Sequence, residues 1–382
     1  MKILFFIEHL GLGGVVRQVS ILADHLGRRG HDVSLLALYT IDPHWNLVSK
    51  VNFDVLTEKP EGLVSAGIRF TKAALALRRL LKKTDIDILY SFQGPNARLI
   101  AWLATRGMAN TQLVWGFQGA GRRNTSRARD WKLALPSHLA KWVSGSVPLM
   151  IANSEAGYTH HKTGGYRCIK QLVINNGFDT DEFKPDSEAR IRLRSQWKIK
   201  NEALIGIVGR LFVLKGHRIF LEAAALLRKE RTDVRFVIVG DGPDKRELEL
   251  LSHELGLTES VILPGARQDM PAVYNALDIL CSSSYSEGLP NVIGEAMACG
   301  VPCVVTDVGD SAKIVGDQGV VVPAGDSQVL AKGLKTMLSK LNDIKPLEIR
   351  DRIVRHFSLE NLVDATETAL NQIHLENSQF ER

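Results

Sequence analysis

Short apolar segments that alternate with helical segments are the feature of this 382-residue chain that most restricts its fold. The expected strands are residues 2–7, 31–39, 86–92, 112–117, 149–153, 171–174, 203–208, 234–239, 260–263, 278–282 and 302–305. The helices expected between them are residues 15–29, 68–83, 97–105, 217–229, 243–255, 269–275 and 291–299, with one more between the strands at 149–153 and 171–174. Strands and helices in this order build parallel sheets through right-handed crossovers, so we predict an α/β fold.

The length and one break in the pattern predict two domains. A chain of 382 residues exceeds the usual size of one domain. Residues 179–185 have Gly, Asp and Pro around them and are the expected linker. We therefore place the domains at residues 1–182 and 183–357, followed by a last helix from about residue 358.

Residues 287–295 carry the first candidate site, because two carboxylates, Glu287 and Glu295, flank a Gly- and Pro-rich turn. From Val292 onward the apolar residues have helical spacing. A helix that begins here directs free N–H groups and a positive dipole end at the turn, which suits a phosphate. The alternative is a buried helix with two incidental glutamates.

A second candidate segment follows the expected strand at residues 203–208. Gly209 ends that strand, and Arg210 and Lys215 lie on the loop before the next helix. Open α/β sheets bind ligands on such loops. Arg offers a fork for phosphate oxygens and Lys a mobile charge, so the pair predicts a diphosphate clamp. Solvated surface cations are the alternative.

The Arg210/Lys215 pair followed by the Glu287 to Glu295 spacing resembles the group 1 (family 4) retaining glycosyltransferases. Supporting segments are residues 11–14, 152–155, 173–179, 239–243 and 295–302. The resemblance implies a GT-B architecture, with two Rossmann-like domains facing across a cleft. It also implies that the first domain binds an acceptor, that the second binds a nucleotide sugar, and that the C-terminal helix crosses back to the first domain.

The resemblance assigns roles to individual residues. Arg210 and Lys215 would stabilise the leaving diphosphate, Glu287 would bind sugar hydroxyls and act in catalysis, and Glu295 would bind the ribose. Further donor contacts would come from Gly13, Gly14, Gly209, Arg267, Gly288, Leu289, Pro290, Asn291 and Val292. Many family members carry a His, and some an Arg, where this chain has Gln118. Glutamine is no base, so Gln118 is the weakest of the catalytic candidates.

No metal and no other cofactor is expected. Asp85 and Asp87 form a DxD pattern, but it leads into an apolar strand, and Asp179 and Asp181 repeat it. No His, Cys, Asp and Glu spacing fits a metal site. Four scattered cysteines without a CxxC pair suggest a reduced, cytoplasmic protein. The apolar N-terminal segment is a strand and too short for a signal peptide.

The charge is unevenly distributed. Residues 1–185 contain 24 Lys and Arg against 14 Asp and Glu, whereas residues 186–382 contain 24 against 28. Residues 68–83 and 122–141 hold much of the excess, the latter beside Trp131 and Trp142. This composition fits peripheral contact with the anionic inner face of a membrane, a lipid-linked or anionic glycan acceptor, or a solvated helix face. No nucleic-acid motif accompanies it.

The sequence therefore predicts a sugar transfer from UDP- or GDP-sugar to a glycan or lipid-linked acceptor, in bacterial cell-surface polysaccharide biosynthesis. Two alternatives stay open. A GT-B nucleotide-sugar epimerase would need ionisable groups for proton abstraction, which Gln118 does not supply. A catalytically silent nucleotide-sugar-binding protein would not need all of Arg210, Lys215, Glu287 and Glu295.

Overall fold

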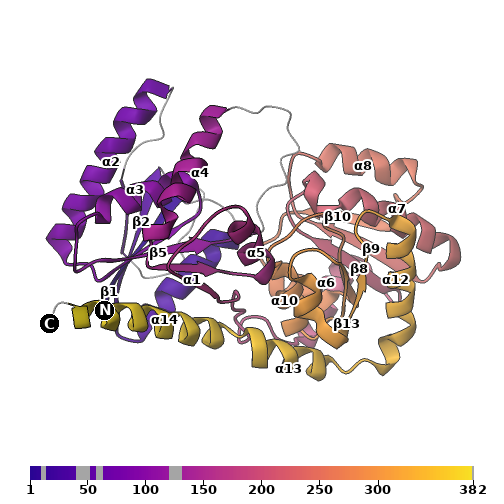
Figure 1. Cartoon of the computed structure of the whole chain (residues 1–382). Coiled ribbons are helices and arrows are strands. Elements are labelled where there is room, and N and C mark those ends of the chain that lie inside the picture. The colour runs from indigo at the N-terminus through magenta and orange to yellow at the C-terminus, as the bar shows by residue number, and fades with distance from the viewer. Residues whose placement is uncertain (10–13, 40–51, 57–62, 120–130, 381–382) are drawn as a thin grey trace. The chain divides into compact units, whose positions relative to one another are not determined.

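The computed structural model describes residues 1–9, 14–39, 52–56, 63–119 and 131–380. The chain forms two compact units, Met1–Gly177 with Glu360–Arg382, and Phe178–Leu359 (Figure 1). The predicted boundary at 182/183 is thus five residues late, and residues 179–185 belong to the second unit. Phe178 explains the difference, since it donates to Phe357 O at 2.8 Å and accepts from Leu359 N at 3.0 Å.

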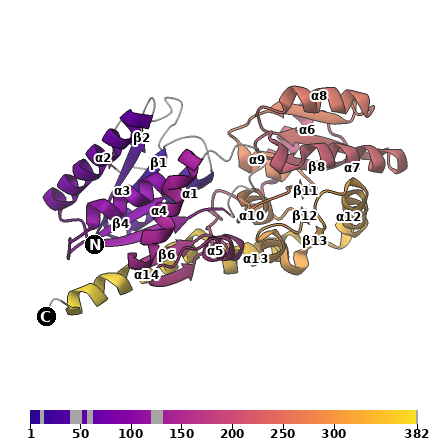
Figure 2. The ribbon, with the colours of Figure 1, turned by 45° about the horizontal axis from the view of Figure 1, so that its top comes forward.

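The first unit has a parallel seven-stranded sheet in the order β3-β2-β1-β4-β5-β6-β7. Strands β1, β2, β4 and β6 of this sheet are labelled in Figure 2. Its strands are β1 (Lys2–His9), β2 (Asp32–Tyr39), β3 (Asn52–Val55), β4 (Ile88–Phe92), β5 (Gln112–Phe117), β6 (Leu149–Ala152) and β7 (Lys170–Val173). Its helices are α1 (Gly14–Arg28), α2 (Leu63–Thr84), α3 (Pro95–Thr105), α4 (Trp131–Val143), α5 (Glu155–Thr163) and α14 (Leu359–Phe380). Apolar side chains of α2, α3 and α4 share one core with the sheet.

The last helix, α14, belongs to the first unit, as the resemblance implied. Glu367 of α14 accepts hydrogen bonds from Arg29 at 2.8 Å and from His31 at 2.7 Å. The last helix, expected from about residue 358, begins at Leu359. Helix α13 (Pro346–Phe357), which the sequence did not predict, ends just before it, and extended Ser358 bridges to Phe178 between the two helices.

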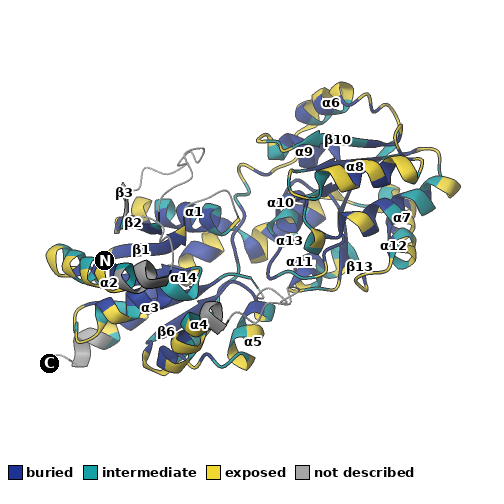
Figure 3. Ribbon diagram, turned by 90° about the horizontal axis from the view of Figure 1, so that it is seen from above, coloured by how far each residue is buried: buried dark blue, intermediate teal, exposed yellow. Residues whose placement is uncertain are grey.

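The second unit has a parallel six-stranded sheet in the order β10-β9-β8-β11-β12-β13. Its strands are β8 (Ala203–Val208), β9 (Val234–Val239), β10 (Val261–Gly265), β11 (Ile279–Ser282), β12 (Cys303–Thr306) and β13 (Gly319–Val322). Its other helices are α6 (Ser187–Gln196), α7 (His217–Glu230), α8 (Lys245–Glu254), α9 (Met270–Ala276), α10 (Asn291–Ala298), α11 (Ser311–Val315) and α12 (Ser327–Lys340). Side chains of the strands pack into two apolar cores, one on each face of this sheet, as is usual for parallel sheets. Buried strands and part-exposed helices show this layering (Figure 3).

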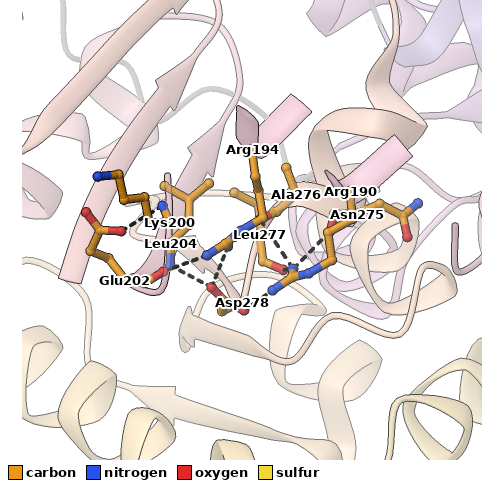
Figure 4. A network of polar contacts seen from close by, with 9 residues as sticks. All are labelled: Arg190, Arg194, Lys200, Glu202, Leu204, Asn275, Ala276, Leu277 and Asp278. Carbon is orange, nitrogen blue, oxygen red and sulfur yellow. Dashed lines mark hydrogen bonds and ion pairs between the residues drawn. The ribbon is translucent and has the colours of Figure 1, made fainter. Parts of the chain in front are cut away.

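An ion-pair network ties α6 to the amino end of β11. Asp278 accepts hydrogen bonds from Arg190 at 2.6 Å, Arg194 at 2.9 Å and the Leu204 amide at 2.7 Å (Figure 4). The same guanidinium groups also donate to the carbonyls of Glu202, Asn275 and Leu277. Both guanidinium groups thus bind the carboxylate and backbone carbonyls at once, so the network serves the packing of the unit.

Candidate active site

The loops after β8 and β11 are joined through their backbones at the carboxyl end of the second sheet. Gly216 has φ +69°, and a Cβ there would lie 2.0 Å from Ser283 O, so only glycine permits this approach. Ser283 Oγ donates to Gly216 O at 2.9 Å, and Tyr285 N donates to Leu214 O at 2.8 Å. These contacts fix Lys215, at the end of the 3-10 turn Val213–Lys215, against the β11 loop.

Lys215 and Glu287, predicted from separate motifs, meet at this junction. Lys215 Nζ lies 2.6 Å from Glu287 Oε1, which also accepts from Ser284 Oγ at 2.6 Å. The Glu287 side chain is 11% exposed and that of Lys215 is 32% exposed. The carboxylate is therefore held in place while its cation still reaches solvent. Ser284, which the sequence did not single out, completes the arrangement.

The turn from Glu287 to the start of α10 is built as the sequence predicted. Gly288, Leu289 and Pro290 are buried, and Pro290 is the N-cap residue of α10. Asp310 N donates to Gly288 O at 2.8 Å, and the close approach of Gly309 leaves no room for a Cβ. Asn291 and Val292 form the first turn of α10 and are half-buried, so the N-terminus of this helix directly follows the Glu287 loop.

Glu295 lies inside α10, where it is 7% exposed. The hydroxyl of Tyr274, from α9, donates to Glu295 Oε2 at 2.6 Å. Burial and then the nearby Glu295 charge raise the pKa of Cys299 to about 12. The sequence missed Tyr274, because a tyrosine among the apolar residues of a short helix is typical of core packing.

The two predicted arginines differ in their surroundings. Arg210 is exposed and makes no ion pair with the residues that the structure describes. Arg267 is bound to Asp269, with Nε donating at 2.8 Å and an Nη at 2.6 Å, and lies 5.7 Å from the Trp197 ring. Gly209, at φ +153°, faces the Lys215 side chain, whose Cδ would be 3.8 Å from an added Cβ.

His217 starts α7 directly after this site and was not predicted as a functional residue. It is 3% exposed, and neither ring nitrogen has a hydrogen-bond partner in the described part of the chain. Burial and then the Lys215 charge lower the pKa of His217 to about 4. The imidazole is therefore neutral at physiological pH.

The remaining predicted residues lie in the first unit. Gln118 follows β5 and lines a cavity of about 20 Å³ together with Gln18, Asn153 and Asn176. Gly14 begins α1 and is exposed, whereas Gly13 lies outside the described residues. The basic residues at 122–130 also lie outside them, but α2 exposes Lys72, Arg79, Lys82 and Lys83.

Among the residues that the structure describes, no three His, Cys, Asp or Glu side chains converge on a common point. Asp87 Oδ2 accepts from the Lys2 amide at 2.7 Å, at the amino end of the first sheet. No described helix is long and apolar enough to cross a bilayer. The four cysteines are free and buried.

Two family models match the chain in tandem: Glycosyltransferase Family 4 over residues 12–182, and Glycosyl transferases group 1 over residues 202–340. The chain belongs to the group 1 glycosyltransferases. It is therefore a glycosyltransferase of enzyme class EC 2.4, and its two Rossmann-like units form the GT-B fold.

Several characterised relatives are similar over most of their length. An N-acetylgalactosaminyltransferase of Campylobacter jejuni, named for a diNAcBac-PP-undecaprenol acceptor, is 28% identical over 91% of both chains. The UDP-Gal:GlcNAc-diphosphoundecaprenol α-1,3-galactosyltransferase of Escherichia coli is 27% identical over 78% of both. The crystal structure of Anabaena HepE in complex with UDP shares the fold, with a TM-score of 0.82 and 23% identity over 97% of this chain and all of that chain.

Proposed function

We propose that this group 1 glycosyltransferase transfers a sugar, with retention of configuration, from a nucleoside-diphosphate sugar to a glycan on a lipid carrier. The observation that carries the proposal is the fixed Lys215–Glu287 pair before the N-terminus of α10. A cation, a helix dipole and a held carboxylate in one place suit a ligand with phosphate beside hydroxyl groups.

The charge of the leaving group is met by three features. The bond between the anomeric carbon and the phosphate oxygen breaks, and negative charge develops on the diphosphate. Lys215, the exposed Arg210 and the N–H groups at Asn291 stabilise it, an electrostatic effect that can supply several kcal/mol. No divalent ion is needed for this step, since protein cations meet the phosphate charge.

The two glutamates of the site contact different parts of the donor. Glu287, held by Lys215 and Ser284, accepts hydrogen bonds from the sugar hydroxyls, where positive charge develops. Glu295, oriented by Tyr274, accepts from the ribose. Gly288 to Val292 line the diphosphate, and Arg267 with Gly265 borders the nucleotide base, uracil or guanine.

The proton of the acceptor hydroxyl goes to the departing phosphate oxygen as the new bond to the anomeric carbon forms. This assignment follows from Gln118, which has no basic group. Retention then requires attack from the side that the leaving group vacates. The first unit holds the acceptor.

The acceptor class rests on relatives and on charge. Two relatives that match over most of the chain are named for undecaprenol-linked acceptors, which supports a lipid-linked glycan and a role in bacterial cell-surface polysaccharide biosynthesis. The exposed cations of α2 favour peripheral contact with an anionic membrane where such acceptors reside. Sedimentation with anionic vesicles at low salt, and release at high salt, would support this contact, whereas no binding at low salt would contradict it.

The test of the proposed function is a panel of UDP- and GDP-sugars in excess EDTA, read out as released nucleoside diphosphate. Release with at least one donor, raised by a bacterial polyprenol-linked glycan fraction, supports the proposal. Abolition by EDTA with rescue by Mn²⁺ or Mg²⁺ would contradict metal independence. Failure with every donor, with or without metal, would contradict the donor class.

A further inference from the structure

Polar side chains gather where β1, β2 and β4 end, in the first unit. The sheet order β2-β1-β4 means that the chain leaves β1 toward one side and returns on the other, so the switch point lies between β1 and β4. Open α/β sheets bind ligands outside the strands' carboxyl ends at such a point. Glu8 and His9 end β1, Tyr39 ends β2, and Gln93 and Asn96 follow β4.

Glu8 is the unusual member of this group. It is 8% exposed, and its Oε1 accepts from Asn96 Nδ2 at 3.1 Å. Its Oε2 is buried and has no hydrogen-bond partner among the described residues. Gly94 makes room for it, because a Cβ at that position would lie 1.8 Å from Oε2. A buried carboxylate with one amide partner is costly, and such groups are typical of binding sites.

An aromatic surface lies beside this carboxylate. The rings of His9 and Tyr39 stack with centroids 5.2 Å apart, and His9 Nε2 lies 3.8 Å from Glu8 Oε1. Burial and then the Glu8 charge raise the pKa of the Tyr39 phenol. The His9 amide donates to Gln93 Oε1 at 3.0 Å, and Gln93 has a left-handed φ of +68°. Strained backbone of this kind is concentrated at functional sites.

We propose that Glu8, His9, Tyr39 and Asn96 form the subsite that binds the hydroxyl groups of the acceptor sugar. This inference deepens the proposed function and rests on it. A carboxylate accepts hydrogen bonds from hydroxyls and repels phosphate, so the subsite takes the neutral sugar of the acceptor and not its diphosphate. The stacked rings of His9 and Tyr39 offer a flat apolar surface for the C–H face of a pyranose ring.

The test uses octyl glycosides of glucose, galactose, N-acetylglucosamine and N-acetylgalactosamine, titrated by ligand-observed NMR. Glu8→Gln keeps the size of the side chain and removes its charge. His9→Ala changes a side chain that is 52% exposed, so folding is preserved. The matched control is Asp87→Asn, which removes a carboxylate from the amino end of the same sheet, opposite the proposed subsite. Titration of UDP and GDP by calorimetry on the same samples reports the donor site separately.

We expect wild type and Asp87→Asn to bind at least one glycoside equally. Glu8→Gln and His9→Ala should bind it on the order of 10-fold more weakly, as for the loss of a charge-assisted hydrogen bond. Equal binding by all four proteins, or no binding by wild type, overturns the subsite. Displacement of the glycoside by spermidine would also overturn the subsite, because the Glu8 carboxylate would then be a binding site for a cation. If wild type binds a glycoside but neither UDP nor GDP, the proposed donor site is contradicted and the acceptor subsite is not.

Discussion

The two ends of strand β11 carry ion pairs that differ in how completely their donors are used. At the amino end, Asp278 is bound by two arginines that also donate to backbone carbonyls (Figure 4). At the carboxyl end, Glu287 is bound by Lys215 and Ser284, and the Lys215 ammonium makes no other hydrogen bond with the described residues. Arg210, nearby in sequence, has no ion pair there either.

This difference indicates that the charged groups at the amino end of β11 stabilise the fold, whereas those at the carboxyl end can bind a ligand. The Asp278 carboxylate is bound by two guanidinium groups and a backbone amide, so a ligand would have to displace one of them. The Lys215 ammonium has three N–H groups and one carboxylate partner, so it can turn toward a phosphate at little cost. We therefore expect changes at the two ends to affect different measurements.

The largest expected effect is at the carboxyl end. Lys215→Ala and Arg210→Ala should each lower kcat/KM on the order of 10²-fold, because each removes charge that faces the leaving diphosphate. The Tm should fall by only a few degrees, since Glu287 keeps the Ser284 hydroxyl. The matched control is Lys335→Ala, which removes an exposed lysine paired with Glu230. If both single variants keep kcat/KM within a few-fold of the wild-type value, the carboxyl end of β11 does not bind the leaving diphosphate.

At the amino end, the effect should be on stability. Asp278→Asn leaves two guanidinium groups without their carboxylate and should lower the free energy of unfolding by about 2 kcal/mol. Denaturant titration measures this change, with Asp233→Asn, an exposed partner of Arg231, as the control. kcat per folded molecule should stay unchanged, and a selective loss of kcat would contradict the division.

The two glutamates of the site sharpen the comparison further. Glu295→Gln should weaken nucleoside diphosphate binding about 10-fold, because a ribose contact exists before the reaction. Glu287→Gln should lower kcat by a similar factor with little effect on nucleotide affinity, since its contact strengthens as charge develops on the sugar. Calorimetry and steady-state kinetics separate these outcomes, and equal losses of affinity in both variants would refute the role assignment.

The smallest expected effect concerns His217. Its pKa is about 4 in the folded protein and near 6.5 in the unfolded chain, so the unfolded chain binds more protons between these values. Stability is then full above pH 6.5 and falls as the pH drops toward 4. His217 should account for a loss of about 1 kcal/mol between pH 6.5 and 5.5. Denaturant unfolding of His217→Gln should show a shallower pH slope, and an unchanged slope would disprove the assignment.

Local patterns predicted elements that are mostly buried or clearly amphipathic. Strand β8 and helix α10 are apolar enough to be recognised alone, and the α10 turn placed Glu287 correctly before the helix. The pattern missed helices α4, α6, α11, α12 and α13 and strands β3 and β13. Helix α6 has a weakly amphipathic, charged sequence, and Asp278, distant in sequence, holds it in place.

The individual site contacts depend on distances in space that no spacing encodes. The sequence predicted Lys215 and Glu287 separately, but the Gly216–Ser283 approach that joins them is visible only in three dimensions. Tyr274 and His217 resembled core residues. Glu8 resembled the polar end of a strand until its burial was known.

The most direct test of the account is calorimetric titration of UDP and of GDP into wild type and Lys215→Ala, in excess EDTA, with the Tm of each protein measured on the same sample. We predict that wild type binds at least one nucleotide, and that Lys215→Ala binds it on the order of 10- to 100-fold more weakly at nearly the same Tm. Equal affinity in the two proteins would show that the carboxyl end of β11 holds no diphosphate, and would contradict the account.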